Sequence, residues 1–408
     1  MNTEQTSCND AFLIAILQNN DDSAEAQQVI DHVGNCVVCQ KRLELLAASD
    51  DEWEEAGEVL AANADAELAS RARVRKGSWC VNKWGDRPLA WTESMAKQLL
   101  SPPSHPEMMG RIGRYEVERL IGAGGMGVVF KAFDTELNRP VAIKLLAPFL
   151  AGSGPARKRF AREARAAAAV VHEHVVPIHN VETDGESPFL VMHYVAGDSL
   201  QGRLDREGAL DVCEILRIGM QAASGLSAAH AQGLVHRDVK PSNILLEQGV
   251  ERAFITDFGL ARAKDDVGLT QTGYHPGTPK YMSPEQARGD AVDGRSDLFS
   301  FGSVLYAMCT GLAPLRAETS YGILRRIIDT EPQQIRELNP SIPEWLCTII
   351  SKLMSKQPEG RYASATEVAE VLEACLAHVQ QPLSAQLPRS IMNSPPSQIG
   401  RASCRERV

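Results

Sequence analysis

The segment from His236 to Asn243 holds a carboxylate, an ammonium group and an amide within six residues. Asp238 can accept a proton from a hydroxyl group and orient that hydroxyl as a nucleophile. Lys240 can neutralise the charge that develops on a phosphoryl group in transfer. Asn243 can ligate Mg²⁺, and Asp257, in Asp257-Phe258-Gly259, would be the principal Mg²⁺ ligand. Together these residue types predict phosphoryl-transfer chemistry.

A glycine-rich segment upstream reads Gly122-Ala123-Gly124-Gly125-Met126-Gly127-Val128-Val129. Taken alone it is compatible with a flexible turn. In a dinucleotide-binding unit the third glycine opens a helix, but here a strand-like pattern follows. We therefore interpret it as a hairpin whose backbone N–H groups approach phosphates. Lys144 would add a positive charge for the α- and β-phosphates. Glu163, on a helical alanine-rich run, is the candidate carboxylate that holds Lys144, and Glu173 is its competitor.

The elements that must position these residues change in type along the chain. Strand-like patterns occupy Tyr115–Gly122, Val128–Asp134 and Arg139–Leu146, and helical patterns dominate after Leu200. This order predicts an α+β arrangement of two lobes. The uncharged stretch Leu298–Leu315 could be a membrane span, but its Ser, Thr, Gly and Pro residues favour a buried helix that ends at Gly311.

The first 113 residues differ from the rest of the chain in their composition and residue pattern. Residues 7–48 are expected to form a small helical unit, and residues 49–113 an acidic and then proline-containing linker. His32, Cys36 and Cys39 have zinc-ligand spacing, and Cys8 could complete a tetrahedral site. The alternative is two unrelated buried cysteines and a surface histidine. At the other end, the Pro-, Ser- and Gln-rich residues 379–408 are expected to be a disordered tail.

The composition narrows the class of protein. The 408 residues carry a formal net charge of −10, and we therefore expect no nucleic-acid partner. Residues 1–70 hold 15 acidic and 2 basic residues, so the acidity lies in the N-terminal segment. That segment could contact a basic regulatory protein. Scattered cysteines and the lack of a signal peptide favour a cytoplasmic catalytic domain. Membrane attachment would require a chain that continues beyond residue 408.

Because these motifs follow one another in this order along the chain, the segment Tyr115–Leu376 resembles the bacterial eukaryotic-like serine/threonine protein kinases. The resemblance implies a two-lobed kinase fold over 114–378, with an antiparallel sheet plus one helix first and a mainly helical lobe after it. It also implies ATP and Mg²⁺ (or Mn²⁺) as cofactors and Ser/Thr hydroxyls of proteins as acceptors. The N-terminal Cys and His pattern resembles the zinc-binding anti-sigma-factor fold, a small all-α module.

The resemblance also assigns residue roles. Met192, His193 and Val195 would lie in the segment that contacts adenine. The complete set assigned to ATP binding is Ile121, Gly122, Ala123, Gly124, Gly125, Met126, Gly127, Val128, Val129, Ala142, Lys144, Glu163, Met192, His193 and Val195. Structural roles are implied for Arg237, Thr278, Glu285, Asp297 and Arg361. Asp297 would hold the backbone of the catalytic loop, which is the segment His236–Asn243. Arg361 would pair with Glu285, and Thr278 would bond to Asp238 or Lys240.

Regulation is expected at Thr270 and Thr272, which lie between Asp257 and Glu285. Arg237 beside Asp238 is a ready partner for a phosphate on either threonine, and a dimer could phosphorylate them in trans. The alternative is that both are ordinary loop threonines. Two other functions compete with a protein kinase: an inactive kinase scaffold with a partner-binding zinc module, and a small-molecule kinase, which the Gly277–Glu285 segment disfavours.

Overall fold

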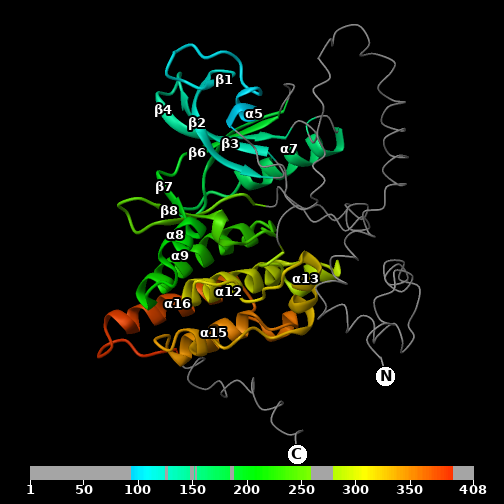
Figure 1. Ribbon diagram of the computed structural model, residues 1–408. Coiled ribbons are helices and arrows are strands. Elements are labelled where there is room, and N and C mark those ends of the chain that lie inside the picture. The colour runs from blue at the N-terminus through cyan, green and yellow to red at the C-terminus, as the bar shows by residue number, and fades with distance from the viewer. Residues whose placement is uncertain are drawn as a thin grey trace, which may run out of the picture. The chain divides into compact units, whose positions relative to one another are not determined.

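The computed structural model describes residues 93–124, 127–147, 151, 154–183, 188–258 and 279–388. A six-stranded antiparallel sheet comes first, with the strand order β1-β2-β3-β4-β6-β5 (Figure 1). Its strands are β1 (Gly110–Ile112), β2 (Tyr115–Gly124), β3 (Gly127–Asp134), β4 (Arg139–Leu146), β5 (Ile178–Glu182) and β6 (Phe189–His193). The three strands predicted from the sequence are confirmed as β2, β3 and β4. We call residues 93–193 the sheet lobe.

Residues 93–112, which we expected to belong to a linker, are part of the sheet lobe. Helix α5 (Glu93–Lys97) buries Ala96, and β1 pairs with β2 in the register Gly110↔Val117. Ala96, Met109 and Ile112 are buried in one hydrophobic cluster with core residues of β2 and β3. The linker prediction is therefore wrong for this stretch. Its few apolar residues are scattered between prolines, so the sequence shows neither a helical nor a strand period there.

Helix α7 (Gly154–Ala168) covers one side of the sheet (Figure 1). Phe160 and Ala164 on α7 pack in a cluster with Leu146 of β4 and Leu190 of β6. This packing fixes the helix that carries Glu163 against the strand that carries Lys144.

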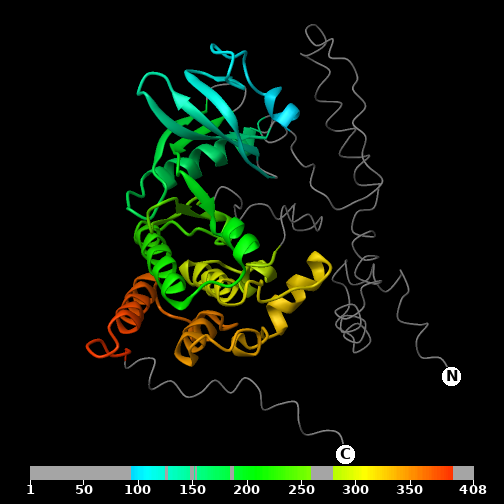
Figure 2. The same ribbon diagram turned by 60° about the vertical axis from the view of Figure 1, so that its left-hand side comes forward.

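The helical lobe comprises residues 194–258, 279–316 and 324–388. A small sheet has the order β7-β8-β9, and helices α9 and α16 pack side by side although they are far apart in the sequence (Figure 2). The elements are β7 (Gly197–Ser199), α8 (Leu200–Glu207), α9 (Val212–Ala231), η1 (Pro241–Asn243), β8 (Ile244–Glu247), β9 (Ala253–Ile255), α11 (Pro284–Arg288), α12 (Gly294–Thr310), α13 (Ser320–Asp329), α14 (Ile335–Leu338), α15 (Glu344–Leu353), η2 (Pro358–Gly360) and α16 (Ala365–Gln380).

Helix α12 is the buried helix that the uncharged stretch predicted. Every residue from Ser296 to Cys309 is buried, so this part of α12 is enclosed on all sides and has no stripe that faces solvent. The helix ends at Gly311, whose φ of 73° is a left-handed conformation that glycine adopts without strain. None of the helices in the described residues combines the length and the hydrophobicity that a membrane span requires.

The described residues divide into two compact units, and Ala317–Ile323 is the described part of the smaller one. There the Gly322 N–H donates to Thr319 Oγ1 at 3.1 Å, which caps the start of α13. Residues 379–388, which were expected to belong to a disordered tail, are part of the described structure: α16 extends to Gln380, and His378 Nδ1 bonds the Ala385 carbonyl oxygen at 2.7 Å. The proposed zinc module at 7–48 lies outside the described residues.

Candidate active site

The glycine-rich hairpin joins β2 to β3, with Gly124 opposite Gly127. Gly127 has a φ of 148°, and a Cβ at this position would overlap the carbonyl oxygen of Leu145 on β4. A side chain is therefore excluded here, and the hairpin can lie close to its neighbouring strand. Gly125 and Met126 lie outside the described residues.

An apolar cluster lies beneath the hairpin. It contains Ala142 of β4, Met192 of β6 and Val195, with Val129 of β3 packed against them. These four residues were assigned to ATP binding from separate parts of the sequence, and the fold brings them together. The His193 N–H donates to the Pro177 carbonyl oxygen at 2.9 Å, which fixes the segment after Met192. Such a surface suits the apolar faces of an adenine ring.

Lys144 forms an ion pair with Asp257, whose Oδ1 lies 2.8 Å from the Lys144 Nζ. Burial alone would raise the pKa of Asp257, but the charge and hydrogen bond of Lys144 outweigh it and lower this pKa. The carboxyl group is therefore ionised near neutral pH. The sequence pattern indicates Glu163 as the partner of Lys144 and gives no sign of the pairing with Asp257. Glu163 is half-buried on α7, and its pairing with Lys144 stays a prediction.

Lys240 and Asn243 both contact Asp238. Lys240 Nζ lies 2.7 Å from Asp238 Oδ2, and Asn243 Nδ2 donates to the Asp238 carbonyl oxygen at 2.9 Å. The Thr256 N–H donates to the Asn243 carbonyl oxygen at 3.0 Å. This bond links the loop that carries Asp238 to the segment that carries Asp257.

Asp297 holds the backbone just before Asp238. Its carboxylate accepts the N–H groups of His236 and Arg237, both at 2.7 Å, and it contacts His230 Nε2 at 2.8 Å. Arg237 has a φ of 65°, a conformation that costs a non-glycine residue about 1–3 kcal/mol. The buried Asp297 carboxylate is the fixed acceptor that offsets this strain. The expected tie between Asp297 and the catalytic-loop backbone is thus present.

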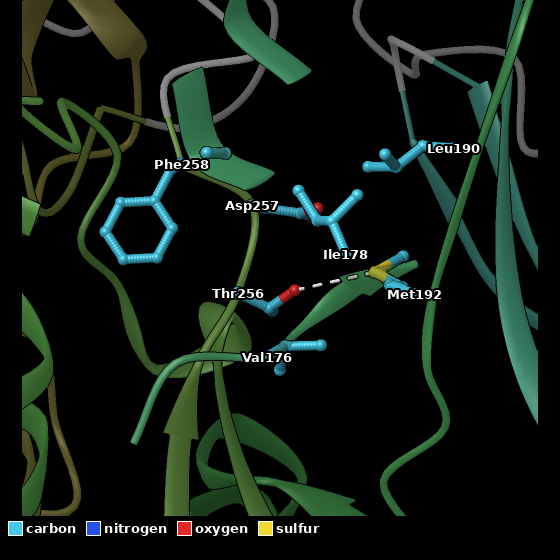
Figure 3. A pocket seen from close by; sticks show the side chains of 8 residues that line it. Val176, Ile178, Leu190, Met192, Thr256, Asp257 and Phe258 are labelled. Carbon is cyan, nitrogen blue, oxygen red and sulfur yellow. Dashed lines mark hydrogen bonds between the residues drawn. The ribbon is translucent and has the colours of Figure 1, made fainter. Parts of the chain in front are cut away.

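Behind Asp257 the two lobes enclose a small cavity (Figure 3). The Phe258 ring packs on the His236 ring with centroids 4.6 Å apart, and His236 Nε2 bonds the Thr256 carbonyl oxygen at 2.9 Å. Met192 lies opposite, and the Thr256 hydroxyl contacts its sulfur at 3.9 Å. These contacts keep Phe258 buried in the helical lobe and leave the neighbouring Asp257 next to Lys144.

Glu285 and Arg361 form a buried bidentate pair. Arg361 donates to the two carboxylate oxygens of Glu285 at 2.7 and 2.9 Å. Burial disfavours the charged carboxyl, but hydrogen bonds from Arg361 and Ser296 outweigh it, and they hold the pKa of Glu285 below its usual value. The expected pair is therefore present. Of the other predicted residues, Thr270, Thr272 and Thr278 lie outside the described residues.

Comparison with known proteins agrees with this geometry. Residues 115–374 match the family described as protein kinase domain. The chain belongs to the protein kinase family. It is 40% identical over 267 residues to a probable serine/threonine-protein kinase of Clostridium acetobutylicum, a match that covers 65% of this chain and 40% of that protein. It is 38% identical over 277 residues to the serine/threonine-protein kinase PknD of Mycobacterium tuberculosis, with 68% and 42% covered.

Among solved structures, the crystal structure of the PknI kinase domain of Mycobacterium tuberculosis matches with a TM-score of 0.52 and 28% identity. The match covers 64% of this chain and 96% of that domain. The two-lobed kinase fold is thereby shown for the matched part. The chain spans about two fifths of the length of the two curated kinases named above.

Proposed function

We propose that this chain is a serine/threonine protein kinase that transfers the γ-phosphoryl group of Mg-ATP to a protein hydroxyl. The observation that carries the proposal is the cluster of Asp238, Lys240 and Asn243, joined through the Thr256–Asn243 bond to the Lys144–Asp257 pair. One connected set of contacts thus contains a proton acceptor (Asp238), two cations (Lys144 and Lys240) and two oxygen donors for a metal (Asn243 and Asp257). The names of the related kinases support the same activity.

Each residue has a role in this chemistry. The Asp238 carboxylate accepts the proton of the incoming hydroxyl and directs its oxygen. Lys240, already 2.7 Å from Asp238, neutralises charge on the phosphoryl group as it moves. Lys144 contacts the α- and β-phosphates, and the backbone of the glycine-rich hairpin covers them. The catalytic power comes mainly from positioning and electrostatics.

The donor set fits Mg²⁺, which prefers oxygen ligands and carboxylates. Asp257 has a lowered pKa and is charged, and the side-chain oxygen of Asn243 is the second donor. When bound, Mg²⁺ would offset the negative charge of the phosphates. The Lys144–Asp257 ion pair is then the contact that a metal would compete for.

Radiolabelled phosphate transfer tests the proposal. The full chain, given Mg-ATP with a radioactive γ-phosphate and myelin basic protein, is expected to label Ser and Thr, and excess EDTA should abolish the labelling. Phosphoamino-acid analysis separates the acceptors. Labelling of Tyr alone would contradict the Ser/Thr assignment. Transfer that is absent in the wild type, with Mg-ATP still bound, would favour the inactive-scaffold alternative.

We propose further that the kinase phosphorylates Thr270 and Thr272 in its own activation segment. The support is the position of both threonines between Asp257 and Glu285, and the proximity of Arg237 to Asp238 in the sequence. Peptide mapping after incubation with ATP should find phosphate on at least one of them, and none on either would end this proposal. An initial rate that rises with the square of kinase concentration would support transfer between two copies.

The N-terminal cysteine and histidine motif is the basis of a separate proposal, a zinc site made by Cys8, His32, Cys36 and Cys39. Its support is the ligand spacing alone. Zinc measured on the full chain should approach one equivalent and fall in Cys36→Ser. Equal zinc content in both proteins would remove Cys36 from the site, and absence of zinc from both would remove the site.

A further inference from the structure

The peptide bond between Arg237 and Asp238 is held on both of its sides. Its carbonyl oxygen accepts a hydrogen bond from Gln286 Nε2 at 2.7 Å, and its N–H, on Asp238, donates to His236 Nδ1 at 3.3 Å. This peptide carries the Asp238 N–H and ends at its Cα, so its orientation helps to set the direction in which the Asp238 side chain leaves the loop. On its other side, Arg237 has a positive φ. Asp297 anchors the two preceding peptides, through the His236 and Arg237 N–H groups, and leaves the Arg237–Asp238 peptide to other partners.

Gln286 reaches this carbonyl from α11, where it is the third residue. Its Oε1 accepts the Ser283 N–H at 3.0 Å, while Ser283 Oγ accepts the Gln286 N–H at 3.3 Å, so the two residues form a capping box. The amide thus uses its oxygen for the helix and its nitrogen for the catalytic loop. The reverse orientation would place N–H against N–H and C=O against C=O, so the contacts define the orientation.

Helix α11, which carries Gln286, is firmly anchored. The preceding residue, Glu285, is buried and bound by Arg361 through two hydrogen bonds, and Ser296 Oγ donates to it at 2.5 Å. A displacement of α11 would therefore be transmitted through Gln286 to the Arg237 carbonyl group. Helix α11 begins within the Gly277–Glu285 segment, whose sequence favours a protein acceptor over a small molecule.

We propose that Gln286 is a positioning residue for the phosphoryl-transfer reaction. It fixes the Arg237–Asp238 peptide and couples the end of the activation segment to the proton acceptor. This inference rests on the proposed kinase function and adds a residue that the motif analysis did not single out. A glutamate at this position can complete the same capping box, but its carboxylate cannot donate to the Arg237 carbonyl oxygen and repels it.

Two variants of the full chain separate positioning from capping. Gln286→Glu keeps the capping box and loses the bond to the loop, whereas Ser283→Ala loses the Ser283 hydroxyl from the box and keeps the Gln286 bond to the loop. With myelin basic protein as acceptor, we expect Gln286→Glu to lower kcat about tenfold, with the KM for ATP within about twofold. Ser283→Ala should keep its kcat within about twofold, measured well below its Tm. Equal kcat losses in both variants, or wild-type kcat in Gln286→Glu, would overturn the inference.

Hydrogen exchange gives a readout that does not depend on activity. Gln286→Glu should speed deuterium uptake in the peptide that spans residues 235–243, and Ser283→Ala should leave that uptake at the wild-type rate. If the wild type transfers no phosphate, the proposed function fails, while faster exchange in Gln286→Glu would still show the mechanical link. Unchanged exchange in Gln286→Glu would refute the link itself.

Discussion

The buried pair of Arg361 and Glu285 offers a quantitative test of the helical lobe. Arg361→Ala removes two hydrogen bonds to Glu285, at 2.7 and 2.9 Å. It also removes the donor for three carbonyl oxygens, those of Ser355, Arg295 and Lys356, at 2.8, 2.8 and 3.2 Å. The Glu285 carboxylate, on a residue with 5% of its surface exposed, keeps the hydroxyl of Ser296 as a donor but loses its cation. The Arg361→Ala variant therefore leaves the negative charge of Glu285 without a cation in the protein interior.

Breaking one side of a buried ion pair costs about 3–5 kcal/mol, which is a large part of the roughly 5–15 kcal/mol that stabilises a typical protein. At about 2–4 °C per kcal/mol for a domain of this size, Tm should fall by roughly 6–20 °C. Adding Glu285→Gln should recover part of the loss, because no charge then stays buried. Arg288→Ala, an exposed arginine on the same helix as Glu285, should change the free energy of unfolding by less than about 0.5 kcal/mol.

The pH dependence follows from the lowered pKa of Glu285. The pair stabilises the native wild type above the ordinary carboxyl pKa of about 4.3, and this contribution is lost as the pH falls through the lower native value. Without Arg361, burial favours the protonated form of the Glu285 carboxyl group. Protonation at low pH removes the buried charge, so the destabilisation caused by Arg361→Ala becomes smaller in acid. Urea unfolding should therefore show the full difference at about pH 7 and a smaller one below about pH 4. A difference below about 1 kcal/mol near neutral pH, or one independent of pH, would refute this reasoning.

Three further variants, one of them with a matched control, test the rest of the site and the fold. Lys144→Met should lower kcat/KM for ATP about a hundredfold in steady-state assays, since the phosphates lose their cation; a change below threefold would contradict its role. Asp297→Asn should cost about 2–3 kcal/mol in urea unfolding, because a neutral amide replaces the charged acceptor of two N–H groups. Met109→Ala should cost about 2–3 kcal/mol, whereas Met108→Ala, at the less buried neighbouring position, should cost less than half as much. Equal costs at the two methionines would show that residues 93–112 add little to the sheet lobe.

The strands and α12 were predictable because their signals are local. Short apolar and β-branched runs bounded by turn residues define β2 to β4, and an uncharged run followed by Gly311 defines a buried helix. The pair of Arg361 and Glu285 was expected from the family resemblance, since it joins residues 76 positions apart in the chain. Spacing along one sequence does not reveal such a contact.

Other features could not be read from the sequence for physical reasons. The Lys144–Asp257 pair depends on how two lobes meet, and either Glu163 or Asp257 satisfies the requirement for a carboxylate. Residues 93–112 join the sheet through backbone pairing and a few scattered apolar contacts, which leave no period in the sequence. Gln286 looks like an ordinary helix residue, and only its geometry shows that its two amide atoms serve different elements.

The most direct measurement compares phosphate transfer by the full wild-type chain and by Asp238→Asn, with Mg-ATP binding measured on the same samples. The variant should transfer phosphate to Ser and Thr at least a hundredfold more slowly than the wild type, because it lacks the proton acceptor. Its Kd for Mg-ATP should stay within about twofold of the wild-type value, because Lys144, Asp257 and the apolar cluster are unchanged. Equal transfer rates in the two proteins would contradict the central claim.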